Sequence, residues 1–181
     1  MAVGTPKKKH KKAFPSFSTL WDAYPPTQQL ADGSIINTYP CDEGSTDPIT
    51  NEFTRRYANQ CAIRLSSCLI KSGVSLATYT DPKCNHGFAR GAESLATWIW
   101  RNFRRPIIIK DARELSNFSS SDYYKKSGII FFKDFYPIGN QTSERYSGDH
   151  IDLLFNETTA SYHGNYVGDP DVKQIWFWEI D

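Results

Sequence analysis

The sequence is poor in several features that would each point to a class of protein. Its 181 residues contain four cysteines, too few for a disulfide-stapled scaffold, and no CxxC pair of the kind that often begins a structural zinc site. No run of about 18 apolar residues occurs, so we predict no membrane insertion. The formal net charge is only +1, unlike the strong basic excess of a dedicated nucleic-acid binder, so we expect no nucleic-acid partner.

The chain is, in contrast, well supplied with large apolar side chains. Hydrophobic residues make up 39% and aromatic residues 14% of a chain whose length is typical of one domain. Five lysines between positions 7 and 12 predict a disordered basic arm over residues 1–13, followed by a single domain over residues 14–181. Because the arm lacks the apolar segment of a secretory signal, we expect secretion without a signal peptide.

The pattern of apolar residues changes along the chain from helical to strand-like. It predicts helices over residues 14–24, 59–72 and 91–105, and strands over residues 106–110, 128–134, 150–155 and 173–179. Between the first two helices, Thr27–Asn51 is rich in Gly, Pro, Asp, Thr and Ser and is interpreted as a long loop. Helices early and strands late, without βαβ alternation, predict an α+β domain with a mostly antiparallel sheet.

The second predicted helix begins with a cysteine. Asn59 is a favourable N-cap, Gly73 suits the position that follows the helix, and Cys61 lies in the first turn. There the helix dipole and unpaired N–H groups can stabilise a thiolate, which is the nucleophilic form. A lone cysteine in such a place is nevertheless more often a small buried apolar residue, so the position by itself does not establish catalysis.

A histidine in a later strand gives the cysteine a potential partner. Alternation along GDHIDLLF places Ile151 and Leu153 on one face and His150 and Asp152 on the other. A cysteine at the start of a central helix, followed much later by a histidine on a strand, is the order used by papain-like thiol hydrolases. The helix would supply thiolate stability and an oxyanion hole, and the sheet would hold the base.

Two segments resemble the type VI secretion amidase effectors, in particular their fourth family: Asn59–Ser66 (NQCAIRLS) and Ser147–Leu153 (SGDHIDL). The aromatic helix around Trp21 and the closing segment Ile175–Trp178 agree with this family. The resemblance covers nearly the whole chain after the basic arm. It implies a papain-like (NlpC-type) fold, in which N-terminal helices, including the nucleophile helix, pack on a mostly antiparallel sheet.

The resemblance also implies a function. Members of this family cleave the amide between D-glutamate and meso-diaminopimelate in peptidoglycan stem peptides, and type VI secretion injects them into the periplasm of rival bacteria. We therefore expect an antibacterial toxin whose partners are the stem peptide, the secretion apparatus and a cognate immunity protein. Cys61 matches the nucleophile and His150 the general base.

The third catalytic residue does not carry over cleanly. The family usually places an aspartate about a dozen residues beyond the histidine, where this chain has His163. Asp152 is the rival, but same-face neighbours two residues apart on a strand are separated by about 6.6 Å of rise. We therefore prefer His163 as the residue that orients His150, with Asp152 as the alternative.

No cofactor or metal is expected. His86 and Cys84 alone are a weak indication of a metal site, and the spacing does not decide whether Cys41 and Cys84 form a disulfide. Two other functions stay open from the sequence. A non-catalytic module that binds the cell wall or a partner protein would show no thiol reactivity at neutral pH. A transglutaminase-like acyl transferase would use the same residues and would differ only in its products.

Overall fold

The computed structural model describes residues 12–57, 59–136, 148–161 and 165–181. The helices are α1 (Phe17–Ala23), α2 (Cys61–Lys71), α3 (Ala92–Asn102), α4 (Ala112–Ser116) and the 3-10 turn η1 (Phe118–Ser120). The strands are β1 (Thr27–Gln29), β2 (Ile35–Asn37), β3 (Gly44–Thr46), β4 (Phe53–Arg55), β5 (Ile107–Ile109), β6 (Gly128–Tyr136), β7 (Gly148–Phe155), β8 (Thr158–Thr159) and β9 (Gln174–Glu179). Residues 1–11 of the predicted basic arm lie outside the described residues.

The centre of the molecule is a five-stranded sheet in the order β5-β9-β6-β7-β8. Every neighbouring pair is antiparallel, and β6 is paired along most of its length with both β7 and β9. The predictions of an α+β fold and a mostly antiparallel sheet are therefore confirmed.

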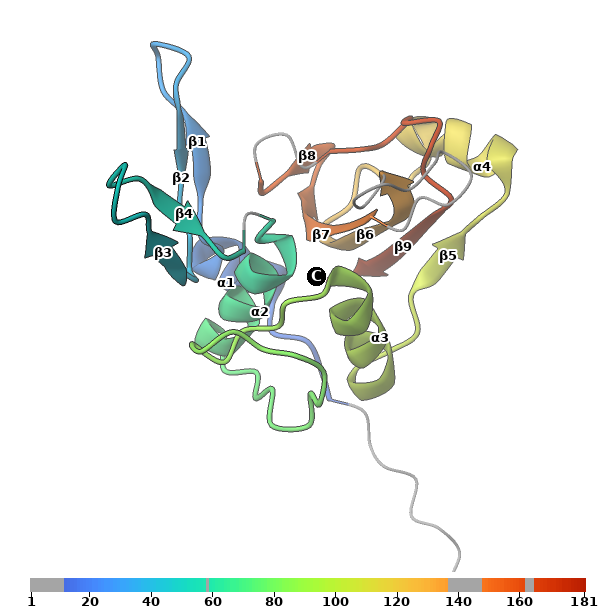
Figure 1. Cartoon of the computed structure of the whole chain (residues 1–181). Coiled ribbons are helices and arrows are strands. Elements are labelled where there is room, and N and C mark those ends of the chain that lie inside the picture. The colour runs from blue at the N-terminus through green and yellow to red at the C-terminus, as the bar shows by residue number, and fades with distance from the viewer. Residues whose placement is uncertain (1–11, 58, 137–147, 162–164) are drawn as a thin grey trace, which may run out of the picture.

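Both faces of the sheet are covered, which explains why its strands are almost continuously apolar. Helices α1, α2 and α3 lie together beside the sheet in Figure 1, and their apolar residues form one core cluster with Phe131, Ile151 and Trp178. The opposite face forms a second cluster, in which Phe118 of η1 packs with Phe132 and Phe177. β7 thus runs through the interior, with α2 packed against it.

The prediction that Thr27–Asn51 forms a long loop is wrong. It contains β1, β2 and β3, and two hairpins, β1–β2 and β3–β4, project from the body of the molecule (Figure 1). Each strand has only three residues, too short for an alternating apolar pattern to be recognised. The dipeptide Asp32-Gly33 is a hairpin signal that the composition obscured: Gly33 has a φ of 83° and Ser34 N–H donates to Asp32 Oδ1 at 2.9 Å.

Helix α2 begins later than the sequence indicated. The N-cap is Gln60 rather than the predicted Asn59, and Cys61 is the first helical residue. The predicted end is confirmed, because Gly73 has a φ of 86° and its N–H donates to the Ile70 carbonyl at 3.0 Å.

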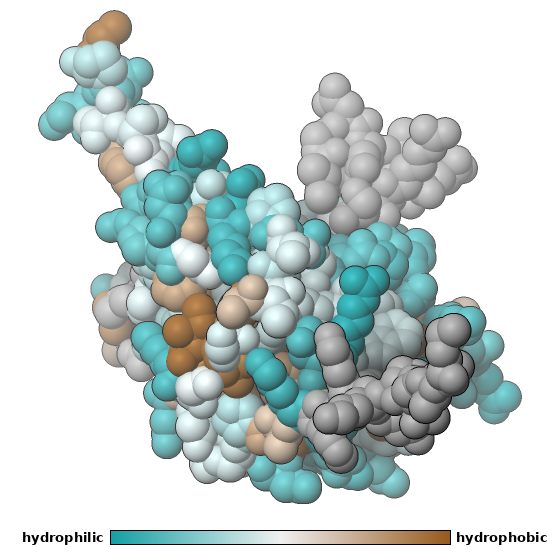
Figure 2. Space-filling model, turned by 90° about the horizontal axis from the view of Figure 1, so that it is seen from below, coloured by the Kyte–Doolittle hydropathy of each residue, from teal (hydrophilic) through white to brown (hydrophobic). Residues whose placement is uncertain are grey.

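The surface seen from below is largely hydrophilic, with a small hydrophobic area near its middle and another at the tip of a projection (Figure 2). Within the described part of the chain, no helix is long and apolar enough to cross a membrane.

Candidate active site

The Cys61 thiol lies at the tip of α2, beside the first residues of β7. Cys61 is 7% exposed, and its Sγ lies 4.0 Å from the carbonyl oxygen of Asp149. As the first residue of the helix, Cys61 is at the positive end of the helix dipole. The folding of α2 against β7 therefore brings this thiol to the sheet strand that carries His150.

The imidazole of His150 contacts two of the groups that the sequence singled out. Its Nε2 lies 3.4 Å from Asp152 Oδ2, and the Cys61 sulfur is close enough to influence its pKa. Burial by itself lowers the pKa of His150, but the Asp152 carboxylate and the Cys61 sulfur outweigh it and raise this pKa from its ordinary 6.5 to about 9. Because Asp152 occupies Nε2, Nδ1 is the nitrogen available to the thiol.

Asp152 is held in place by the backbone on two sides. Its Oδ1 accepts from Leu153 N–H at 2.8 Å and its Oδ2 accepts from Ser161 N–H at 3.0 Å. Asp152 is fully buried, and these bonds turn its carboxylate toward the imidazole two residues away. The separation along the strand, which favoured His163 in the sequence, is thus overcome by side-chain orientation. His163 itself lies outside the described residues.

A tyrosine from α1 completes this buried polar group. The Tyr24 hydroxyl lies 3.1 Å from Ser161 Oγ and is near the Asp152 carboxylate. Burial, followed by the nearby charge of Asp152, raises the pKa of Tyr24 well above its ordinary value, so the hydroxyl keeps its proton and can donate it in a hydrogen bond. The sequence predicted only that Tyr24 ends the first helix and gave no sign of this polar role.

Two side chains fix the chain just ahead of the nucleophile. Asn59 Nδ2 donates to the Tyr136 hydroxyl at 2.7 Å, and Asn59 Oδ1 accepts from Cys61 N–H at 3.4 Å. The Tyr136 hydroxyl in turn donates to the Asp149 carbonyl at 3.4 Å. These bonds join α2 to the strands β6 and β7 around the thiol.

Gln60 ties the start of α2 to a different segment. Its Nε2 donates to the Cys41 carbonyl at 2.5 Å, and its Oε1 accepts from Cys41 N–H at 3.3 Å. The side chain of Gln60 is buried by this pairing. Cys41 N–H is therefore already bonded within the protein and is not available as a donor to an oxyanion.

Tyr166 forms an aromatic wall behind the histidine. Its ring meets that of His150 edge to face, with 5.2 Å between the ring centres, and it also packs on Phe135. Burial, followed by the nearby sulfur of Cys61, raises the pKa of Tyr166. The sequence gave no signal for this residue, because it lies in an irregular segment without periodicity.

Comparison with known proteins identifies the fold and the family. Residues 57–178 match the family described as type VI secretion system amidase effector protein 4, or Tae4. The chain belongs to the Tae4 family. It therefore is a type VI secretion amidase effector, a peptidoglycan amidase toxin delivered to the periplasm of target cells.

A solved structure has the same fold. The type VI effector Tae4 from Enterobacter cloacae superposes with a TM-score of 0.56 at 13% sequence identity, covering 95% of this chain and 100% of that chain. The predicted papain-like α+β architecture and the resemblance to the amidase effectors are confirmed. No curated protein gives a significant match.

Proposed function

We propose that this Tae4 protein hydrolyses the amide between D-glutamate and meso-diaminopimelate in peptidoglycan stem peptides, as an NlpC-type cysteine peptidase. In this proposal Cys61 is the nucleophile, His150 the general base and Asp152 the orienting residue. One observation carries it: the buried imidazole of His150 lies 3.4 Å from the Asp152 carboxylate and close enough to the Cys61 sulfur for that sulfur to raise its pKa. Such an arrangement activates a nucleophile through a base that a third group orients.

The reaction follows in two halves. Cys61 Sγ, having passed its proton to His150, attacks the carbonyl carbon of the γ-D-glutamyl amide. His150 then gives that proton to the departing amino group of diaminopimelate, the C–N bond breaks, and a thioester remains. In the second half His150 removes a proton from water, the water oxygen attacks the thioester carbonyl, and the proton returns to the sulfur as the glutamyl carboxylate leaves.

The raised pKa of His150 supports this sequence of steps. At about 9, the pKa keeps the imidazole protonated at neutral pH, so the proton that the leaving amine requires is already in place. The negative oxygen that forms during attack needs hydrogen-bond donors, and Cys61 N–H is the nearest candidate. Its present bond to Asn59 Oδ1 is long, at 3.4 Å, and a charged substrate oxygen forms a stronger one.

The orienting role goes to Asp152, with His163 as the alternative. Asp152 is fixed by two backbone N–H groups and lies 3.4 Å from the imidazole, which supports a stable orientation. Asp152→Asn should lower kcat by about a hundredfold or more, since it removes the charge that favours the imidazolium. His163→Ala should leave kcat within a few-fold of the parent. Reversed effects of these two substitutions would assign the role to His163.

The remaining proposals concern organisation and partners. We infer that residues 14–181 form one catalytic domain and that the lysines of residues 1–13 form a separate basic arm. Because an amidase effector threatens any cell whose periplasm it enters, we expect the producing cell to make a cognate immunity protein that covers the Cys61 site.

The experiment that tests the function is digestion of purified peptidoglycan, followed by mass spectrometry of the released fragments. The parent should produce fragments that end in D-glutamate and fragments that begin with meso-diaminopimelate, and Cys61→Ala should produce neither. Cys68→Ala is the matched control, because Cys68 lies seven residues further along the same helix, with its Sγ 3.1 Å from the Leu20 carbonyl oxygen. Adding an amine to the digestion separates hydrolysis from acyl transfer, because an acyl transferase would join the glutamyl group to the added amine instead of to water. Equal digestion by Cys61→Ala would refute the mechanism.

A further inference from the structure

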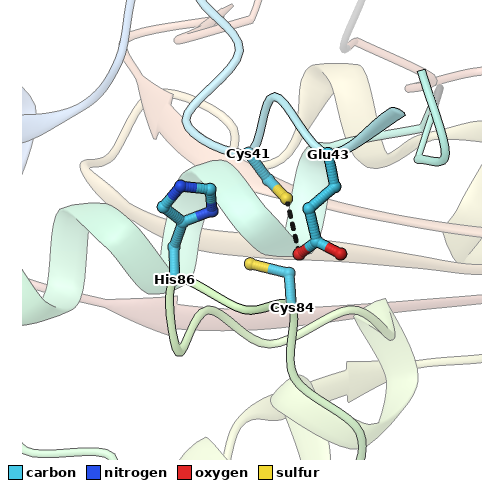
Figure 3. Close-up of side chains that lie close together, drawn as sticks. All are labelled: Cys41, Glu43, Cys84 and His86. Carbon is cyan, nitrogen blue, oxygen red and sulfur yellow. Dashed lines mark hydrogen bonds between the residues drawn. The ribbon is translucent and has the colours of Figure 1, made fainter. Parts of the chain in front are cut away.

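Four metal-ligating side chains that the proposed mechanism does not use lie together on one side of α2. Cys41 and Glu43 come from the segment that leads into β3, and Cys84 and His86 come from the connection between α2 and α3. One ligand atom of each residue lies within 4.8 Å of the other three. Figure 3 shows the two sulfurs, the carboxylate and the imidazole turned toward a common centre.

The donor set is that of zinc. Two thiolates, an imidazole nitrogen and a carboxylate oxygen suit Zn²⁺, which prefers four ligands in a tetrahedron. With usual zinc–ligand bond lengths, neighbouring donor atoms lie about 3.3–3.8 Å apart. Cys41 Sγ and Glu43 Oε1 are already 3.4 Å apart, and the other separations need to close by at most about 1.5 Å.

Each pair of ligands comes from a short segment with the pattern Cys-x-ligand. The segment with Cys84 and His86 is a tight turn: Gly87 N–H donates to the Cys84 carbonyl at 2.8 Å, and Gly87 has a φ of 81°. The Glu43 carboxylate accepts from Asn85 N–H, which joins the two segments directly. The positions of the donors are therefore set by backbone geometry.

An outer residue orients the imidazole. Asp42 Oδ1 lies 3.5 Å from His86 Nε2, so that Nδ1 is the nitrogen turned toward the sulfurs (Figure 3). A carboxylate on the far nitrogen of a histidine is the usual support of a zinc ligand, because it fixes the ring and makes it more basic.

We propose that Cys41, Glu43, Cys84 and His86 bind one structural zinc ion. All four coordination positions are filled by the protein, which is the arrangement of a structural site rather than a catalytic one. This departs from the sequence-based expectation of no metal. Cys84 and His86 alone were a weak signal, and their partners lie some 40 residues earlier in the chain.

The ion would also support the start of the nucleophile helix. Gln60, the N-cap of α2, is bonded to both the N–H and the carbonyl of Cys41. A metal bond at Cys41 Sγ would hold that backbone, and through Gln60 the residue before Cys61, in a fixed place. Binding of zinc does not depend on the proposed hydrolysis, so the two ideas can fail separately.

The test uses the full chain with the substitution Cys61→Ala. This removes the thiol of the proposed active site, so that it cannot contribute to metal binding. The protein is prepared with a non-thiol reductant, its zinc content is measured, and the chelated form is titrated with Co²⁺. We expect one equivalent of zinc per chain, and with Co²⁺ the visible bands of a tetrahedral ion together with thiolate charge-transfer absorption. Chelation should lower the Tm, and one equivalent of zinc should restore it.

Variants connect the signal to the proposed ligands. His86→Asn should weaken Co²⁺ binding at least about tenfold, and Cys84→Ser should lose about half of the charge-transfer absorption per bound ion, because one of the two thiolates is removed. Cys68→Ser is the control with the same chemical change elsewhere, and it should bind as the parent does. The His86 side chain is 44% exposed, so its variant tests the site even where Cys84→Ser folds poorly.

The proposal is wrong if the reduced chain takes up no Co²⁺ with thiolate bands, or if those bands survive His86→Asn at parental affinity. A digest of the protein purified without reductant that shows a Cys41–Cys84 disulfide would also overturn it. In the structure all four cysteines, each within the described part of the chain, carry free thiols.

Discussion

Replacing His150 by glutamine tests the electrostatic centre of the site through stability rather than through activity. The folded-state pKa of His150, about 9, lies above its ordinary 6.5 because Asp152 and Cys61 outweigh the cost of burial. The protonated imidazole therefore stabilises the folded chain in full below pH 6.5, and this contribution is lost as the pH rises through 9. A neutral amide at this position has no such pH dependence.

The magnitude follows from the two pKa values. A tenfold change in a proton equilibrium corresponds to about 1.4 kcal/mol, so the pH-dependent contribution of His150 is about 3 kcal/mol. The free energy of unfolding of the parent minus that of His150→Gln should therefore fall by about 3 kcal/mol between about pH 6 and pH 10. Asp149, whose pKa burial raises to about 6, is present in both proteins and largely cancels in the difference.

Urea unfolding followed by tryptophan fluorescence measures this difference, since urea adds no charge that would screen the site. Circular dichroism on the same samples checks that the two probes give one transition. Asp152→Asn is the second arm of the experiment: it keeps the imidazole but removes its acidic partner, so most of the pH dependence should disappear. A parent-minus-variant difference that stays constant from pH 6 to pH 10 would refute the reasoning.

Three further substitutions probe the surroundings of the site. Tyr24→Phe removes a hydroxyl that hydrogen-bonds the buried Ser161 beside Asp152, so thermal unfolding should show a loss of about 1–2 kcal/mol and digestion assays a lower kcat. Gly128→Ala places a methyl group in a clash with the Trp178 carbonyl oxygen, and urea unfolding should show a loss of about 3 kcal/mol or more, the upper range for overpacking. Tyr136→Phe frees the asparagine ahead of the nucleophile and should lower kcat about tenfold with little change in Tm.

The sequence alone determined the elements that carry the proposed chemistry. The apolar period around Cys61 predicted a central helix, and the alternation around His150 predicted a buried strand, and both elements are present as α2 and β7. These signals are local: helix and strand periods depend on residues a few positions apart, and a Gly or Pro ends them. The short hairpins of Thr27–Asn51 escaped because three-residue strands carry almost no period.

Only the tertiary structure decided which groups meet. The preference for His163 over Asp152 rested on distance along one strand, but backbone donors from Leu153 and from the next turn rotate the carboxylate toward the imidazole. In the same way, the ligand pairs around Cys41 and Cys84 are separated in sequence and are joined by the packing of two loops against α2. Such contacts depend on how whole elements pack and on side-chain orientation, and neither is encoded in the spacing of neighbouring residues.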